Sequence, residues 1–244
     1  MRIAVLQQKG GSGKTTLAAN LAAAAHLEGL RTILIDMDRQ GSAIDWAGAR
    51  PDGSKLDGLV VVGHDRPLSL PRFAEVTQGF DCVLIDGPPR LDDVTRSAAA
   101  AADVALLPVQ PGCFDFWAVS ETLASLDTAD EIRAELGRPP IRRVFVLNRA
   151  PVGSRLARDG EQELRAGGGI FAGVVHQRVA FADAALRGES VFTTPGALLA
   201  ASEIQRLWRA VKAQANGTQD GKSARTTRRK SSRSRKKESS SKAQ

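Results

Sequence analysis

Short, continuously apolar segments recur along the chain and alternate with longer segments that are rich in Ala and Leu. Most of the short segments are apolar at every position rather than at alternate positions, which is typical of parallel strands covered on both faces. The longer segments have the length of helices, and the first of them, residues 15–29, ends on a glycine as helices often do. We therefore predict strands at residues 2–7, 31–36, 59–63, 81–86, 103–109, 143–148 and 173–175.

The alternation of strands and helices predicts an α/β fold with a doubly wound, mostly parallel sheet. Ligands of such sheets bind beyond the carboxyl ends of the strands. Three polar segments lie at these ends, namely residues 8–15, 36–38 and 86–89. We therefore expect one site to which all three segments contribute.

Residues 9–16, KGGSGKTT, have the composition of a loop that binds phosphate. Glycine lets backbone N–H groups approach and encircle phosphate oxygens. Lys14 would reach the β- and γ-phosphates, the Thr15 hydroxyl would be a ligand of Mg²⁺, and the helix that starts there points its positive end at the same phosphates. We predict that a nucleotide is bound by Gly10, Gly11, Ser12, Gly13, Lys14, Thr15 and Thr16.

This loop is a variant of the usual phosphate-binding pattern. The pattern G-x-x-x-x-G-K-[ST] requires glycine at position 8, where the chain has Gln8. The chain also has a second lysine, Lys9, five positions before Lys14. The alternative is a glycine-rich turn that binds nothing, but the predicted strand before the loop and helix after it argue against this.

Three aspartates are candidates to work beside the loop. Asp36 and Asp38 lie two residues apart and so face the same side of an extended chain. One of them could hold a magnesium-bound water while the other orients the attacking water, although both could also be ordinary turn acids. Asp86 ends the apolar segment CVLID and could act on Mg²⁺ as a Walker-B acid. The predicted metal-site residues are therefore Thr15, Asp36 and Asp86.

The excess positive charge of the chain lies at its C-terminal end. Residues 222–244 hold ten Lys or Arg and one acidic residue, so 24 of the 34 basic and 26 of the 27 acidic residues remain in residues 1–221. The terminal stretch has no large apolar residue and cannot bury enough surface to fold. We predict a P-loop domain over residues 1–216 and a disordered basic tail over 217–244 that binds polyanions such as nucleic acid. The alternative is a tail that only increases solubility.

The sequence contains no stretch of about twenty apolar residues that would span a membrane. Its first residues lack the features of a secretory signal. The two cysteines, Cys82 and Cys113, form no C-x-x-C pair. We therefore expect a reduced, cytoplasmic protein.

The loop and the two acidic segments, in this order, resemble the deviant Walker-A ATPases of the ParA/MinD group. The likeness is strongest to short ParA-type partition ATPases without an N-terminal helix-turn-helix. The matching pieces are QKGGSGKTTLAANLA, LIDMDRQGSAIDW, VLIDGPP, ADVALLPVQPGCFDFWA and VLNR, and residues 178–192 are similar more loosely. The resemblance implies a slow ATP hydrolase that uses ATP and Mg²⁺ and is stimulated by a partner.

The resemblance also implies roles for single residues. In this group the extra lysine, here Lys9, reaches across a homodimer interface to the nucleotide of the other subunit, so that ATP controls dimerisation. Lys9, Lys14 and Asp38 would then be catalytic, with Asp38 positioning the hydrolytic water, and Asn148 would contact adenine. Arg39 stands where family members often have proline, which leaves the geometry of the switch segment open.

The ATP-bound dimers of this group bind duplex DNA without sequence preference, and a cargo-linked adaptor protein stimulates their hydrolysis. The resemblance therefore implies a nucleoid-associated protein that partitions or positions a plasmid, a chromosome or a protein assembly. Arginines on helix faces are often simply solvated. With that alternative open, the candidate DNA contacts are Arg155, Arg158, Arg178, Arg206, Arg209, Lys212, Arg228, Arg229 and Lys230.

A MinD-like, membrane-associated positioning ATPase is the main alternative. The segment 197–214 predicts an amphipathic helix, with Leu207, Trp208 and Val211 beside basic residues, and such a helix can lie on an anionic bilayer. Its apolar stripe could instead pack on the domain. An iron–sulfur ATPase of the nitrogenase-reductase kind is not indicated, because Cys82 precedes Asp86 and Cys113 stands alone after it; a self-phosphorylating tyrosine kinase is excluded because the chain has no tyrosine.

Overall fold

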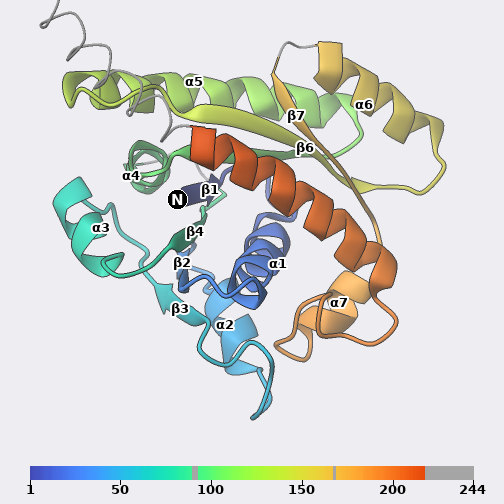
Figure 1. The fold of residues 1–244 in the computed structure, drawn as a ribbon. Coiled ribbons are helices and arrows are strands. Elements are labelled where there is room, and N and C mark those ends of the chain that lie inside the picture. Colours follow the sequence, from blue (N-terminus) through green and yellow to red (C-terminus); the bar gives the residue numbers. More distant parts are fainter. Residues whose placement is uncertain (90–92, 167–168, 218–244) are drawn as a thin grey trace, which may run out of the picture.

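The computed structural model describes residues 1–89, 93–166 and 169–217, with the backbone alone for residues 113–118. Within these residues, seven strands form a sheet in the order β3-β2-β4-β1-β5-β6-β7. Each neighbouring pair in this sheet is parallel. The predicted α/β fold is therefore confirmed, and its sheet is parallel throughout (Figure 1).

Each predicted strand has a counterpart in the sheet, although the bounds differ at several ends. The last two strands extend beyond the predicted ranges, and the first is shorter than predicted. The strands are β1 (Arg2–Val5), β2 (Thr32–Asp36), β3 (Val60–Gly63), β4 (Cys82–Asp86), β5 (Val104–Val109), β6 (Arg142–Ala150) and β7 (Ile170–His176). The helices between and after them are α1 (Lys14–Leu27), α2 (Ser42–Gly48), α3 (Leu70–Val76), α4 (Asp93–Ala101), α5 (Cys113–Glu135), α6 (Arg155–Ala166) and α7 (Val179–Ala185). A further helix, called the last helix below, spans residues 198–217.

Helices cover both faces of the sheet, which explains why its strands are apolar at successive positions. Ile3 and Val5 belong to the core that includes side chains of α1, α2, α7 and the last helix. Ala4 and Leu6 belong to the core on the other face, with side chains of α3, α4, α5 and α6. Each central strand is thus buried on two sides, so an alternating pattern of polar residues is absent from it.

The last helix packs its apolar stripe against the first of these cores. Ile204, Leu207, Trp208 and Val211 are all at most 2 % exposed and lie in the same cluster as α1 and β6. The stripe that could have faced a membrane is therefore covered by the domain. In the part of the chain that the structure describes, no helix has the length and apolar character needed to cross a bilayer.

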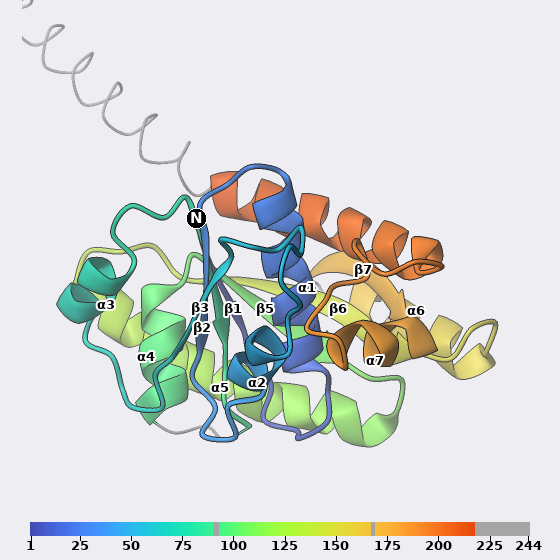
Figure 2. The same cartoon turned by 90° about the horizontal axis from the view of Figure 1, so that it is seen from below.

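The two edges of the sheet have different surroundings. The phosphate-loop segment and the ends of β2, β4, β5, β6 and β7 lie at the carboxyl edge. The end of the last helix lies at the amino edge, where Arg142 at the start of β6 donates a hydrogen bond to the Gln214 carbonyl at 3.0 Å. Figure 2 shows this end of the helix beside the N-terminus. The predicted tail, residues 217–244, lies outside the described residues except for Gly217.

Candidate active site

The loop between β1 and α1 has the backbone that its glycines permit. Gly11 and Gly13 have φ of 74° and 89°, in the left-handed region that other residues rarely adopt. Gly13 is the N-cap of α1, and its carbonyl accepts the N–H of Leu17 at 3.0 Å. The positive end of α1 therefore lies directly at the loop, as an anion site requires.

Side chains from distant strands hold the carbonyl groups of this loop. The Gly11 carbonyl accepts hydrogen bonds from Gln110 Nε2 at 2.7 Å and from Arg149 Nη1 at 2.8 Å. The Ser12 carbonyl accepts one from Asn148 Nδ2 at 2.8 Å. Because Gln110 follows β5 and the other two residues lie near the end of β6, the ends of these strands support the loop from outside.

Lys14 is the first residue of α1, directly after the loop, and its side chain is buried. Its Nζ donates a hydrogen bond to the Lys9 carbonyl at 3.4 Å. Burial lowers the pKa of Lys14, and the carboxylates of Asp86 and Asp38 oppose that shift. These opposing effects show that both acids lie close enough to the lysine to interact with its charge. Lys9 itself is half-buried.

Asp86 is fully buried at the end of β4, and neither of its carboxylate oxygens accepts a hydrogen bond of ordinary geometry from the described residues. Burial raises its pKa to about 7; the Asp36 and Asp38 carboxylates add to the rise, whereas the Thr15 hydroxyl and Lys14 oppose it. A buried carboxylate without donors is costly when ionised. A cation with bound water would compensate its charge and supply donors, so this position fits Mg²⁺.

Asp36 and Asp38 lie in different environments, although they are two residues apart. The buried Asp36 carboxylate accepts the backbone N–H groups of Asp38, Ala43 and Ile44 at 3.0, 2.8 and 3.2 Å, and thereby orders the turn into α2. Burial raises the pKa of Asp36, and these three hydrogen bonds oppose the rise. Asp38 is half-buried and lines the pocket described next. The geometry gives Asp36 a structural role, and its predicted contact with metal stays a prediction.

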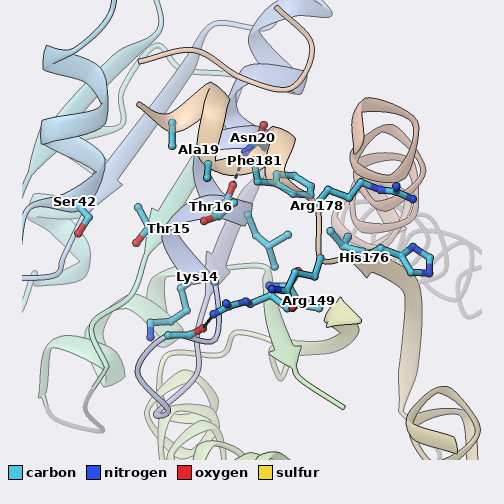
Figure 3. Close-up of a pocket in the computed structure, with 18 of the residues that line it drawn as sticks. Lys14, Thr15, Thr16, Ala19, Asn20, Ser42, Arg149, His176, Arg178 and Phe181 are labelled. Carbon is cyan, nitrogen blue, oxygen red and sulfur yellow. Dashed lines mark hydrogen bonds between the residues drawn. The ribbon is translucent and has the colours of Figure 1, made fainter. Parts of the chain in front are cut away.

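A pocket of about 1160 Å³ connects the loop to the ends of β6 and β7. At one end it is lined by Gly10, Gly11, Gly13, Lys14, Thr15, Thr16 and Asp38. At the other it is lined by Asn148, Arg149, Pro151, Val152, Val175, His176, Gln177, Arg178, Val179, Phe181, Ala182, Ala185 and Glu189. Figure 3 shows Lys14 and Thr15 on one side of this space and His176 and Arg178 on the other. Ser12 is buried inside the loop and does not line the pocket. Among the described residues, no three His, Cys, Asp or Glu side chains cluster closely enough to hold a metal by themselves.

The pocket contains residues that the sequence did not single out. One of them is Arg149, a non-glycine residue with a positive φ of 53°. Arg149 follows Asn148 in VLNR, and Gln110 follows β5. Because sites form at the carboxyl ends of strands, these positions could have been predicted from the sequence as part of the site. Asn148 does line the pocket, but its amide is used on the loop backbone; its predicted contact with adenine stays a prediction.

The predicted DNA contacts fall into three groups. Arg155, Arg158, Arg206 and Arg209 are exposed. Lys212 is held by Glu28 at 2.8 Å, and Arg178 lies in the pocket wall and is held by Glu203 at 2.7 Å. The exposed four are the better candidates because their side chains reach solvent, although Arg155 also pairs with Asp159 at 3.5 Å. Arg228, Arg229 and Lys230 lie outside the described residues.

Comparison with known proteins identifies a protein family that matches most of the chain. The family model described as "CobQ/CobB/MinD/ParA nucleotide binding domain" matches residues 3–191. That range covers the loop, the three aspartates, Asn148 and the pocket wall up to α7.

Two similar sequences come from proteins with named tasks. The chain is 34 % identical over 229 residues to the "Chromosome-partitioning ATPase Soj" of Thermus thermophilus, covering 80 % of this chain and 90 % of that protein. It is 34 % identical over 196 residues to the "Maintenance of carboxysome distribution protein A" of Gloeobacter kilaueensis, covering 80 % and 85 %. Among solved structures, the ATP complex of Cyanothece McdA has the same fold, with a TM-score of 0.67, 15 % identity and coverage of 88 % of this chain and 96 % of that one.

Proposed function

The chain belongs to the family of MinD/ParA nucleotide-binding ATPases, and we propose that it is a Mg²⁺-dependent ATPase whose nucleotide-gated dimer partitions or positions a cargo. The observation that carries the proposal is the buried carboxylate of Asp86, which lies beside Lys14 and Thr15 near the glycine loop and accepts no hydrogen bond of ordinary geometry from the described residues. Such a carboxylate fits a cation next to bound phosphate.

The two ends of the pocket would take the two ends of ATP. The phosphates would bind at residues 10–16, where the α1 N-terminus and Lys14 supply positive charge. The base and ribose would then lie against residues 149–152 and 175–182, where Val175 and Phe181 provide apolar surface.

Thr15 and Asp86 would hold the metal, Thr15 through its hydroxyl and Asp86 through bound water. When present, Mg²⁺ neutralises phosphate charge as it develops during transfer. Asp38, which lines the pocket, would orient the attacking water by accepting a hydrogen bond from it. Lys14 would stabilise the charge that moves onto the phosphate oxygens.

A dimer would complete the site through Lys9. Lys9 stands in the loop five positions before Lys14, which would serve the phosphates of its own subunit. A lysine from a second subunit would tie association to the charge of the nucleotide, so that the triphosphate favours the dimer. We propose this role on the strength of the family.

The cargo function rests on the relatives. One of them is named for partitioning chromosomes and another for distributing carboxysomes, so both DNA and protein cargo are represented. We propose that the ATP-bound dimer binds duplex DNA without sequence preference through Arg155, Arg158, Arg206, Arg209 and the basic tail, and that a cargo-linked adaptor stimulates hydrolysis. The protein would then be associated with the nucleoid.

Co-sedimentation of the full chain with duplex DNA and with anionic liposomes tests this function. It is run with ATP, with ADP and without nucleotide, at two salt concentrations. Binding to DNA in ATP alone, weakened by salt, is the expected result. Binding to liposomes alone would instead establish a membrane-positioning ATPase, with the tail as its anchor.

Two variants sharpen the same experiment. Lys9→Ala should retain ATP binding as a monomer and lose both the ATP dimer, seen by light scattering, and DNA binding. A Lys9→Ala protein that still dimerises would refute the role of this lysine in the partner's site. Removing residues 217–244 should reduce the salt dependence of binding, because ten basic residues are lost.

A further inference from the structure

Glu203, in the last helix, is a buried acid whose hydrogen bonds lead to the nucleotide pocket. Its side chain is 3 % exposed. One carboxylate oxygen accepts the His176 backbone N–H at 3.0 Å, and the other pairs with His176 Nδ1 at 2.8 Å and with Arg178 Nη2 and Nε at 2.7 and 3.2 Å. Burial raises the pKa of Glu203, but the hydrogen bonds from Arg178 and His176 outweigh burial and hold it below its ordinary value.

Both partners of Glu203 stand in the wall of the pocket. His176 ends β7, Arg178 precedes α7, and both line the pocket with Gln177 between them. In Figure 3 their side chains extend away from Lys14 and Thr15, toward the last helix. The side chains of His176 and Arg178 thus tie this part of the pocket wall to the last helix.

We propose that Glu203 is a positioning residue that fixes residues 176–178, and with them the base end of the nucleotide pocket, to the last helix. The proposal rests on the placement of ATP under the proposed function. Glu203 lies outside the range matched by the family model, so its role is a property read from this chain alone.

A purely structural tether is the competing explanation, and the same helix offers a comparison for it. Glu28, at the C-terminal end of α1, accepts hydrogen bonds from Lys212 at 2.8 Å and from Gln205 at 3.2 Å. This second acid also ties the last helix to the domain, but neither it nor its partners line the pocket. Substitution of either acid would therefore weaken the docking of the last helix, whereas only substitution of Glu203 would also release the pocket wall.

Glu203→Gln keeps the shape of the side chain and removes its charge. The amide presents an N–H group to a cluster of donors, so the contacts with His176 and Arg178 open. The wall of residues 176–178 then loses its anchor, and the base loses its rigid partner. The phosphate end, built on residues 10–16, is untouched.

Calorimetry with ADP and steady-state hydrolysis of ATP, both on the full chain, test this role. For Glu203→Gln we expect about tenfold weaker ADP binding and a similar rise in KM, with kcat within about twofold of the unaltered protein. For the control Glu28→Gln we expect both quantities within about twofold. Arg178→Gln should reproduce the Glu203→Gln effect, and the double variant should add little to it. If Glu203→Gln does not fold, Arg178→Gln carries the test.

Three results would overturn the proposal. These are unchanged ADP affinity in Glu203→Gln or Arg178→Gln, equal losses in Glu203→Gln and Glu28→Gln, and a fall in kcat without a change in KM. A different failure, in which the unaltered chain binds neither ADP nor ATP, would remove the proposed function and this inference with it.

Discussion

Apart from Asp38, the phosphate end of the pocket comes from one continuous segment, residues 10–16, whereas the opposite end is assembled from β6, β7 and α7 and anchored by the last helix. At the first end, glycines and the start of α1 place the important groups through local backbone geometry. At the second, residues 149–152 and 175–182 meet only because the sheet brings them together.

The difference shows how one site can combine fixed chemistry with adaptable recognition. Phosphate binding depends on backbone N–H groups and charge, which a short motif can supply by itself. Recognition of a base depends on shape, which requires packing from several elements. Variants at the two ends should therefore change different kinetic constants.

Lys14→Ala should have the largest effect. Loss of the charge that faces the β- and γ-phosphates should lower ATP turnover by at least about 100-fold. Phe181→Ala, at the other end, is the matched variant and should raise KM with kcat kept. Steady-state kinetics distinguish the two. A Lys14→Ala protein that changes KM alone would show that the phosphate end does not carry the chemistry.

Asp38→Ala should lower kcat by about 100-fold and leave ATP affinity nearly unchanged, because its proposed task concerns the attacking water. Single-turnover kinetics and calorimetry measure the two quantities separately. Asp45→Ala, an exposed acid on α2, serves as the control and should behave like the unaltered chain. Unchanged turnover in Asp38→Ala would remove this residue from its role.

Gly13→Ala tests the contact between the loop and Asn148 of β6. A Cβ at Gly13 would lie 2.4 Å from Asn148 Nδ2 and would require an L residue at φ of 89°. We expect a loss of about 3 kcal/mol in the free energy of unfolding, measured with urea. Gly10→Ala, where a Cβ meets nothing within 4 Å, should change it by less than about 0.5 kcal/mol. Equal effects of the two substitutions would contradict the described loop geometry.

Asp86 should make the nucleotide-free protein less stable as pH rises. Its pKa of about 7 lies above the ordinary value, so the folded state retains a proton that the unfolded state releases between about pH 4 and 7. This contribution to stability is full below about pH 4 and is lost as pH rises through 7. Between about pH 5 and pH 8, the free energy of unfolding of Asp86→Asn in urea should rise by about 2.5 kcal/mol relative to that of the unaltered chain.

A bound cation would also stabilise the ionised Asp86 carboxylate, so both proteins are measured in the presence of a chelator. A parallel pH dependence in both proteins would show that Asp86 does not titrate in this range. Asp36→Asn provides a contrast, because it replaces one of two accepting oxygens by an NH₂ group that faces backbone N–H donors, and it should destabilise the protein at both pH values.

The sequence alone was sufficient for the elements and for the phosphate end. Each predicted strand was found, because burial on both faces leaves a continuous apolar signature that depends on no distant partner. The loop, Lys14, Thr15 and the acids at the carboxyl ends of β2 and β4 were also readable, since backbone rules and strand ends determine where they lie.

Only the tertiary structure decided how those residues are used. Asp36 and Asp38 look equivalent in the sequence, yet packing of α2 leaves one saturated by backbone N–H groups and the other facing the pocket. Arg178 and Lys212 look like surface cations, yet each meets an acid from a distant helix. These outcomes depend on contacts between residues far apart in the chain. Which donors reach a carboxylate, and which cations remain exposed, is decided when the helices close onto the sheet.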